Sequence, residues 1–132
     1  SVILRMKEFG ETLGMIFQIT DDLFDYQAEN QSGKPSGNDL KNMKFTLPLL
    51  YAMETAGISK KSTIIRQLFK PGESPENTAL LDFIENNNGF EKTKSKINEL
   101  KNKALSTISD FPENEAKKSL ISLIDYIILR ND

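Results

Sequence analysis

Three aspartates lie inside an apolar stretch, and this stretch strongly limits what the chain can fold into. Residues 14–26 read GMIFQITDDLFDY, in which Asp21, Asp22 and Asp25 are the only charged residues. At about 100° per residue, an α-helix here places Gln18 and the three aspartates on one face. The opposite face is apolar and needs a core; it carries Ile16, Ile19, Leu23 and Phe24. The stretch therefore predicts a helix that is buried on one side and acidic on the other.

The residues alone leave two interpretations of the acidic face open. Aspartates at this spacing are often a solvated helix face. The apolar surroundings favour the other interpretation, because a buried carboxylate is costly unless it is paired or bound to a cation. No Lys or Arg lies between Lys7 and Lys34, so the counter-charge must come from another element or from a metal. Hard divalent cations such as Mg²⁺ prefer oxygen ligands.

The composition excludes several classes of function. A chain of 132 residues supports one hydrophobic core. Its 19 acidic and 17 basic residues give a net charge of −2, so no basic surface for nucleic acid is expected. The absence of Cys and His excludes disulfides, zinc–sulfur sites and a histidine general base. Any catalysis must depend on Asp, Glu, Lys, Tyr or a bound metal.

Targeting and membrane signals are also missing from the sequence. No segment reaches the about 20 apolar residues that a transmembrane helix needs, and no signal peptide is visible. The sequence therefore predicts a soluble, cytoplasmic protein. The chain opens with Ser1 directly in helical periodicity, which we interpret as a fragment that begins partway through a helix.

Helical periodicity runs through the chain, and no alternating strand pattern interrupts it. Thr46 with Pro48 marks a helix start, and Gly57 marks a helix end. The sequence predicts an all-α helical bundle of about six helices. The expected helices cover residues 2–27, 47–55, 59–69, 74–87, 90–109 and 114–130.

Two features beside the acidic face have more than one explanation. Gly10 and Gly14 interrupt the first helix, each at a cost of about 1 kcal/mol relative to Ala. Close approach of another helix and room for a ligand explain them equally well.

Residues 28–45 form a polar, glycine-containing stretch with Lys34 and Lys44, and a loop of this length is usually functional or disordered. Lysines on such a loop can bind phosphate, although an ordinary solvated loop explains them more simply.

Together, the aspartate stretch and this loop closely resemble the second aspartate-rich region of the trans-isoprenyl diphosphate synthases, the polyprenyl synthetase family. The family pattern is FQxxDDxxD, then GKxxGxDxxxxKxT, then an apolar helix opening with Leu-Pro. The sequence matches it in order and spacing at Phe17, Gln18, Asp21, Asp22, Asp25, Gly33, Lys34, Gly37, Asp39, Lys44 and Thr46. It departs at Asn42-Met43, where many relatives carry Glu-Gly. The DYIILR ending resembles the family's last helix.

The resemblance implies a fold, a reaction and a set of site residues. Residues 1–132 would form the C-terminal part of a polyprenyl synthetase domain with the isoprenoid synthase fold. Such enzymes condense an allylic prenyl diphosphate with isopentenyl diphosphate, using three Mg²⁺ ions held between two DDxxD motifs. The implied Mg²⁺ ligands are Asp21, Asp22, Asp25 and, through water, Asp39. The implied diphosphate contacts are Gln18, Lys34 and Lys44, and the implied catalytic residues are Asp21, Asp22 and Lys34.

The sequence contains only one DDxxD motif, so we expect the chain to be inactive by itself. The resemblance implies a homodimer for the full-length enzyme and leans towards the long-chain, octaprenyl-type synthases. Two other interpretations remain. One is a non-catalytic helical subunit or interaction module, against which the intact aspartates argue. The other is a terpene cyclase-like ionising enzyme, against which the GKxxGxD loop argues.

Overall fold

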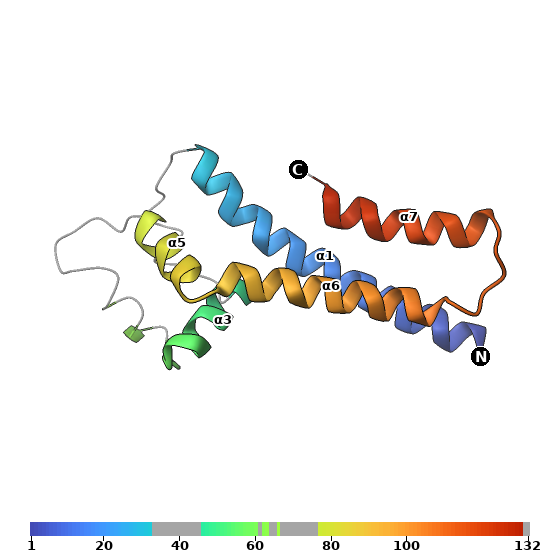
Figure 1. The fold of residues 1–132 in the computed structure, drawn as a ribbon, viewed down its shortest axis with the longest axis horizontal. Coiled ribbons are helices and arrows are strands. Elements are labelled where there is room, and N and C mark those ends of the chain that lie inside the picture. The colour runs from blue at the N-terminus through green and yellow to red at the C-terminus, as the bar shows by residue number, and fades with distance from the viewer. Residues whose placement is uncertain (33–45, 61, 64–65, 67–76, 131–132) are drawn as a thin grey trace. The chain divides into compact units, whose positions relative to one another are not determined.

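The computed structural model describes the backbone of residues 1–32, 46–60, 62–63, 66 and 77–130, and their side chains except at 25–32 and 77–79. Within these ranges the chain forms helices and no strand, which confirms the predicted all-α class (Figure 1). The helices are α1 (Val2–Ser32), α3 (Leu47–Ala56), α5 (Asn77–Asn86), α6 (Gly89–Thr107) and α7 (Glu115–Leu129). The chain divides into two compact units, unit 1 with residues 1–21 and 94–132 and unit 2 with residues 22–93.

The helix bounds agree with the sequence prediction except at the end of α1. This helix ends at Ser32 instead of near residue 27, so the first part of the expected loop is helical. The reason is local, because residues 28–32 contain neither glycine nor proline and Gly33 is the first strong breaker. The rest of the loop, most of the expected helix 59–69 and the expected helix start at 74–76 lie outside the described residues.

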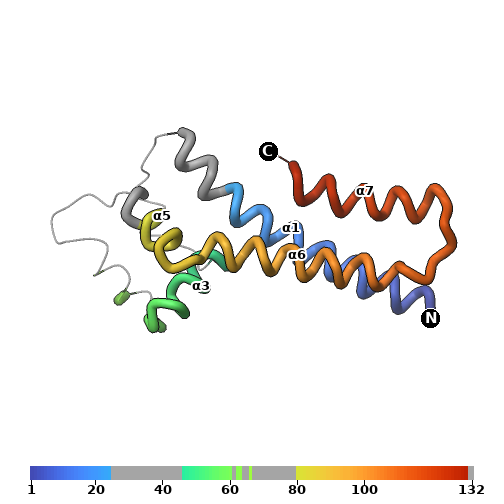
Figure 2. The backbone as a smooth tube through the Cα atoms, in the orientation of Figure 1, coloured from blue at the N-terminus to red at the C-terminus, as the bar shows by residue number. Residues whose placement is uncertain are grey.

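In unit 1, each helix buries one stripe of side chains that are spaced three or four residues apart. α6 and α7 run side by side in opposite directions (Figures 1 and 2). The buried residues are Phe9, Thr12, Ile16 and Thr20 of α1, Ile97, Leu100 and Ala104 of α6 with Ile108 just after it, and Lys117, Ile124 and Ile127 of α7.

The buried stripes of α1 and α7 are narrower than the spacing of their apolar residues predicts. The three- and four-residue spacing places Val2, Met6 and Phe17 inward on α1, and Ala116 and Leu123 inward on α7, but all five are exposed. Phe17 shows the reason, because it lies about 100° around the helix from Ile16. A helix that buries Ile16 fully therefore leaves Phe17 at the edge of its buried face.

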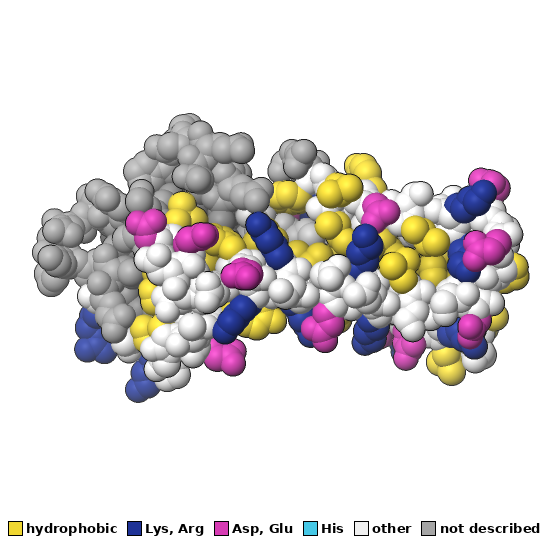
Figure 3. All heavy atoms as spheres, viewed as in Figure 1, with side chains coloured by type: hydrophobic (Ala, Val, Ile, Leu, Met, Phe, Trp, Pro, Cys, Tyr) yellow, Lys and Arg dark blue, Asp and Glu magenta, His cyan; other side chains and the backbone are white. Residues whose placement is uncertain are grey.

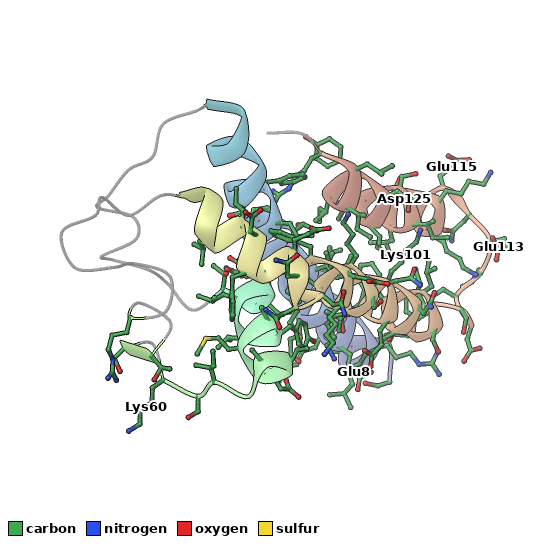
Figure 4. All side chains as sticks on the ribbon, turned by 60° about the vertical axis from the view of Figure 1, so that its left-hand side comes forward. Glu8, Lys60, Lys101, Glu113, Glu115 and Asp125 are labelled. Atoms are coloured by element: carbon green, nitrogen blue, oxygen red, sulfur yellow. The ribbon has the colours of Figure 1, made fainter. Side chains whose placement is uncertain are left out.

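Charged side chains join α6 to α7. Lys101 Nζ lies 3.1 Å from Asp125 Oδ1, and Figure 4 shows the two residues on the neighbouring helices. Figure 3 shows Lys and Arg interspersed with Asp and Glu along this surface, as expected for the polar faces of amphipathic helices. None of the described helices is long and apolar enough to cross a membrane.

Lys117 is a buried charged residue of α7, and its position was not predicted. Its side chain is 9% exposed. Its ammonium group donates to the carbonyl oxygens of Ser109 (3.1 Å) and Phe111 (3.0 Å) and to the carboxylate of Glu113 (2.6 Å). Carbonyls at the end of a helix lack intrahelical donors. The hydrogen bonds of Lys117 therefore connect the turn after α6 to the first turn of α7.

We expect Lys117→Met to lower the free energy of unfolding by about 1–2 kcal/mol, because methionine keeps much of the buried stem and removes three hydrogen bonds. Urea unfolding followed by circular dichroism measures the change. Lys118→Met is the matched control, since Lys118 is exposed and pairs only with exposed Glu115 at 3.6 Å. Equal unfolding midpoints for the two variants would show that the Lys117 ammonium does not stabilise the turn.

Unit 2 has a small core between α3 and α5. It consists of Leu49, Ala52, Met53, Leu80 and Ile84, with Ile58, Leu81, Phe83 and Phe90 packed against it. The predicted signals at the ends of α3 are confirmed. Thr46 is the N-cap residue with extended backbone and Pro48 lies in the first turn, although the Thr46 side chain makes no capping hydrogen bond. Gly57 ends the helix in the left-handed conformation, with φ of 73°.

Gly89, at the start of α6, lies against α3 and α5. A Cβ atom at this position would overlap the carbonyl oxygen of Pro48 and would lie 2.7 Å from Ile84 Cγ2 and 3.2 Å from Ala52 Cβ. The sequence predicted a helix break at Gly89. The structure adds that the position is too close to its neighbours for any side chain.

Candidate functional site

Four of the predicted site residues lie on α1, spaced as the sequence analysis expected. Gln18, Asp21, Asp22 and Asp25 occupy positions i, i+3, i+4 and i+7 of one continuous helix. Gln18 and Asp21 are exposed, and Asp22 is half-buried. The backbone of Asp25 is helical, and its side chain is outside the description. Lys34, Asp39 and Lys44 also lie outside the described residues.

The acidic face lies opposite the buried stripe of α1. Successive buried positions such as Phe9 and Ile16 lie about 180° around the helix from Gly14 and Gln18. Gly10 and Gly14 belong to the same exposed strip, and a Cβ atom at either would meet no described atom within 4 Å. Within the described part of the chain, no other helix therefore packs closely against these glycines, so close helix approach does not explain them there.

Arg130 forms an ion pair with Asp21, the first aspartate of the acidic face. Arg130, the residue that follows α7, donates from Nη2 to Asp21 Oδ1 at 3.0 Å. The sequence predicted a counter-charge for the carboxylates from another element or from a metal, and Arg130 supplies one for Asp21. The Asp21 side chain is still 57% exposed, so solvent and solutes reach it on its open side.

Three other groups of α1 hold the guanidinium in place. It stacks on the ring of Phe17, with Cζ 3.9 Å from the ring centroid. Nη2 donates to the carbonyl oxygen of Phe17 at 3.3 Å and lies 3.5 Å from Thr20 Oγ1. The Thr20 hydroxyl donates in turn to the carbonyl oxygens of Ile16 and Phe17. As a result, the Arg130 side chain is only 8% exposed.

The donor set on α1 fits a hard cation such as Mg²⁺. The side chains on this face offer carboxylate and amide oxygens, and the chain has no cysteine thiolate or histidine imidazole to favour a softer metal. Asp21 and Asp22 supply two described carboxylates. Within the described side chains there is no cluster of three or more acidic residues. Mg²⁺ commonly binds through one or two carboxylates, with waters and substrate phosphates completing its shell.

Arg130 was not predicted as a residue of this site. The signal was present, because an arginine directly follows the apolar sequence DYIILR. Its partner could not be read from the sequence, since Asp21 lies more than a hundred residues earlier and only the packing of unit 1 brings the two together.

Comparison with known proteins identifies the family. The polyprenyl synthetase family model matches residues 1–86, which include all of α1. The chain belongs to the polyprenyl synthetase family. A crystal structure of a geranylgeranyl pyrophosphate synthase from Bacteroides thetaiotaomicron is 30% identical, with a TM-score of 0.70 over 97% of this chain and 42% of that chain. The polyprenyl synthetase resemblance seen in the sequence is therefore confirmed, and so is the all-α fold.

Curated polyprenyl synthetases of similar sequence cover nearly all of this chain. A probable mitochondrial hexaprenyl pyrophosphate synthase of Neurospora crassa is 34% identical over 93% of the chain. The octaprenyl diphosphate synthase of Haemophilus influenzae is 34% identical over 96% of it. Component 2 of the heptaprenyl diphosphate synthase of Geobacillus stearothermophilus is 33% identical over 96%. The chain spans 27%, 39% and 39% of the length of these three relatives.

Proposed function

We propose that this chain carries the second aspartate-rich motif of a polyprenyl diphosphate synthase, a prenyltransferase that extends an allylic prenyl diphosphate with isopentenyl diphosphate. The observation that carries the proposal is the solvent-accessible Asp21, placed with Gln18 and Asp22 on the open face of α1. This segment lies within the part of the chain that matches the family model.

In the proposed site, Asp21, Asp22 and Asp25 would hold Mg²⁺, and Asp39 would act through water. The metal would supply charge stabilisation for the departing diphosphate of the allylic substrate. Gln18, Lys34 and Lys44 are proposed to contact the diphosphate oxygens and to hold the leaving group in place while negative charge develops on it.

The open strip of α1 gives the allylic substrate a place beside the helix. Gly10 and Gly14 are exposed and lie on the same side as Gln18 and Asp21, one and two turns before them. A helix without side chains at these positions lets an apolar prenyl chain lie close to its backbone. We propose this as the reason that α1 contains the two glycines despite their cost in helix stability.

We propose that the chain is the C-terminal part of a polyprenyl synthetase domain; its match to only 27–39% of the length of three relatives supports a partial domain. A metal site bridged between two aspartate motifs cannot form on one motif, so we propose that the isolated chain is inactive. From the family resemblance, we also propose that the full-length enzyme is a homodimer. Hexaprenyl and octaprenyl synthases among the relatives support a long-chain product. A cytoplasmic location stays a prediction, because some relatives are mitochondrial or chloroplastic proteins.

The test is a product assay on the full-length protein. With Mg²⁺, farnesyl diphosphate and radiolabelled isopentenyl diphosphate, we expect long-chain polyprenyl diphosphates on thin-layer chromatography. We expect none when EDTA is present, and none from residues 1–132 alone. The proposed function would be contradicted if the full-length protein formed no prenyl product, both alone and after a second synthase component from the same organism is added.

The heptaprenyl relative supports testing the alternative of a non-catalytic helical subunit, since its name describes it as one component of a synthase. If product forms only after a second protein is added, the chain belongs to one subunit of a two-component enzyme. Aspartate substitutions in the chain then separate a catalytic component from a non-catalytic one.

A further inference from the structure

Arg130 is held by more contacts than an ion pair with an exposed carboxylate needs. The guanidinium stacks on Phe17, donates to the Phe17 carbonyl oxygen and lies beside Thr20 Oγ1. These groups are part of α1 and persist whether or not Asp21 is charged. Arg130 therefore has contacts that hold it independently of Asp21, and Asp21 is the exposed member of the pair.

A fixed guanidinium restricts the rotation of the carboxylate that it binds. The Asp21 side chain would otherwise move among several rotamers, and the interaction at Oδ1 selects one of them. An ionised carboxylate offers about four lone-pair positions on its two oxygens. Asp21 can thus accept from Arg130 and still bind a cation on its exposed side.

We propose that Arg130 is a positioning residue for Asp21, and that its guanidinium fixes the carboxylate in the orientation that binds the divalent cation. This rests on the proposed function, because it takes Asp21 as a metal ligand. The guanidinium–carboxylate pair then plays the part that hydrogen-bond partners of metal ligands commonly play, where their loss typically weakens metal binding about 10- to 100-fold.

The same contact has an opposite explanation, which the experiment must separate. If Arg130 only neutralises Asp21 in the absence of metal, it competes with the cation and its removal strengthens binding. Lysine distinguishes the two effects. It keeps the positive charge, but it lacks the planar fork and the stacking of arginine. A positioning role predicts weaker metal binding in Arg130→Lys, whereas a purely electrostatic role predicts little change.

The experiment is a titration of the full-length protein with Mn²⁺ alone, with free Mn²⁺ measured by electron paramagnetic resonance. We expect Arg130→Lys and Arg130→Gln both to raise the Kd by about 10-fold or more. Phe17→Leu removes the stacking surface at an exposed position and should raise the Kd less. It also gives a second, milder variant if Arg130 substitutions impair folding, which circular dichroism reports. Arg5→Lys is the matched control, because Arg5 pairs with exposed Asp110 at 3.5 Å, away from the site.

The outcomes separate the inference from the proposed function. If Asp21→Asn weakens Mn²⁺ binding and Arg130→Lys does not, the positioning role is wrong and the metal site stands. Tighter binding in Arg130→Gln, with Arg130→Lys unchanged, would instead establish the competing counter-ion role. If Asp21→Asn has no effect on Mn²⁺ binding, Asp21 is not a ligand, and the proposed site is wrong together with the inference.

Discussion

Asp21→Asn in the full-length protein should lower kcat by about 10²- to 10³-fold, the loss typical for removing one group that stabilises developing charge. Asparagine has the shape of aspartate and keeps an oxygen that can accept from Arg130 Nη2. It removes the negative charge that a divalent cation needs. The substitution therefore tests the metal-binding role of Asp21 without breaking the contact between α1 and the end of α7.

Stability should change little in this variant. Asp21 is more than half exposed, and the asparagine oxygen still accepts a hydrogen bond from the buried Arg130 side chain, so the guanidinium keeps a partner. Steady-state kinetics at several Mg²⁺ concentrations, together with thermal unfolding, separate the two effects. Glu8→Gln is the control, because Glu8 is an exposed acidic residue of the same helix outside the proposed site. Unchanged turnover in Asp21→Asn would show that the acidic face of α1 is only a solvated surface.

The fold was predictable because its signals are local. Cap residues such as Thr46 and Gly57 and the period of apolar residues set the helix bounds to within a few positions. The end of α1 was the main error, because the prediction treated the polar composition of residues 28–32 as a loop signal. Polarity does not end a helix, whereas glycine or proline usually does.

The site was predictable only in part, for a physical reason. The period of α1 puts Gln18, Asp21 and Asp22 on one face whatever the rest of the chain does. The partner of Asp21 depends instead on where the end of α7 lies against α1, which is a property of packing. Lys117 shows the same limit. A lysine is expected at the protein surface, and Lys117 is buried only because the turn between α6 and α7 places carbonyl oxygens around its ammonium group.

Gly89→Ala should be the most destabilising single-methyl change in unit 2, lowering the free energy of unfolding by about 3 kcal/mol, at the upper end of the range for overpacking. The added Cβ would overlap the carbonyl oxygen of Pro48, which belongs to the backbone of α3 and cannot move away by changing a rotamer. Relief requires α6 to shift from α3, which disturbs the core formed by Ala52 and Ile84.

Gly10→Ala is the matched control for this effect. Both residues are helical glycines, but a Cβ at Gly10 meets no described atom within 4 Å, so the better helix propensity of alanine should raise stability by up to about 1 kcal/mol. Urea unfolding of the two variants should therefore give midpoints shifted in opposite directions. A Gly89→Ala midpoint equal to that of the unsubstituted protein would mean that α6 does not approach Pro48 as closely as the structure shows. In that case Gly89 would be needed only to end the preceding helix, as the sequence alone suggested.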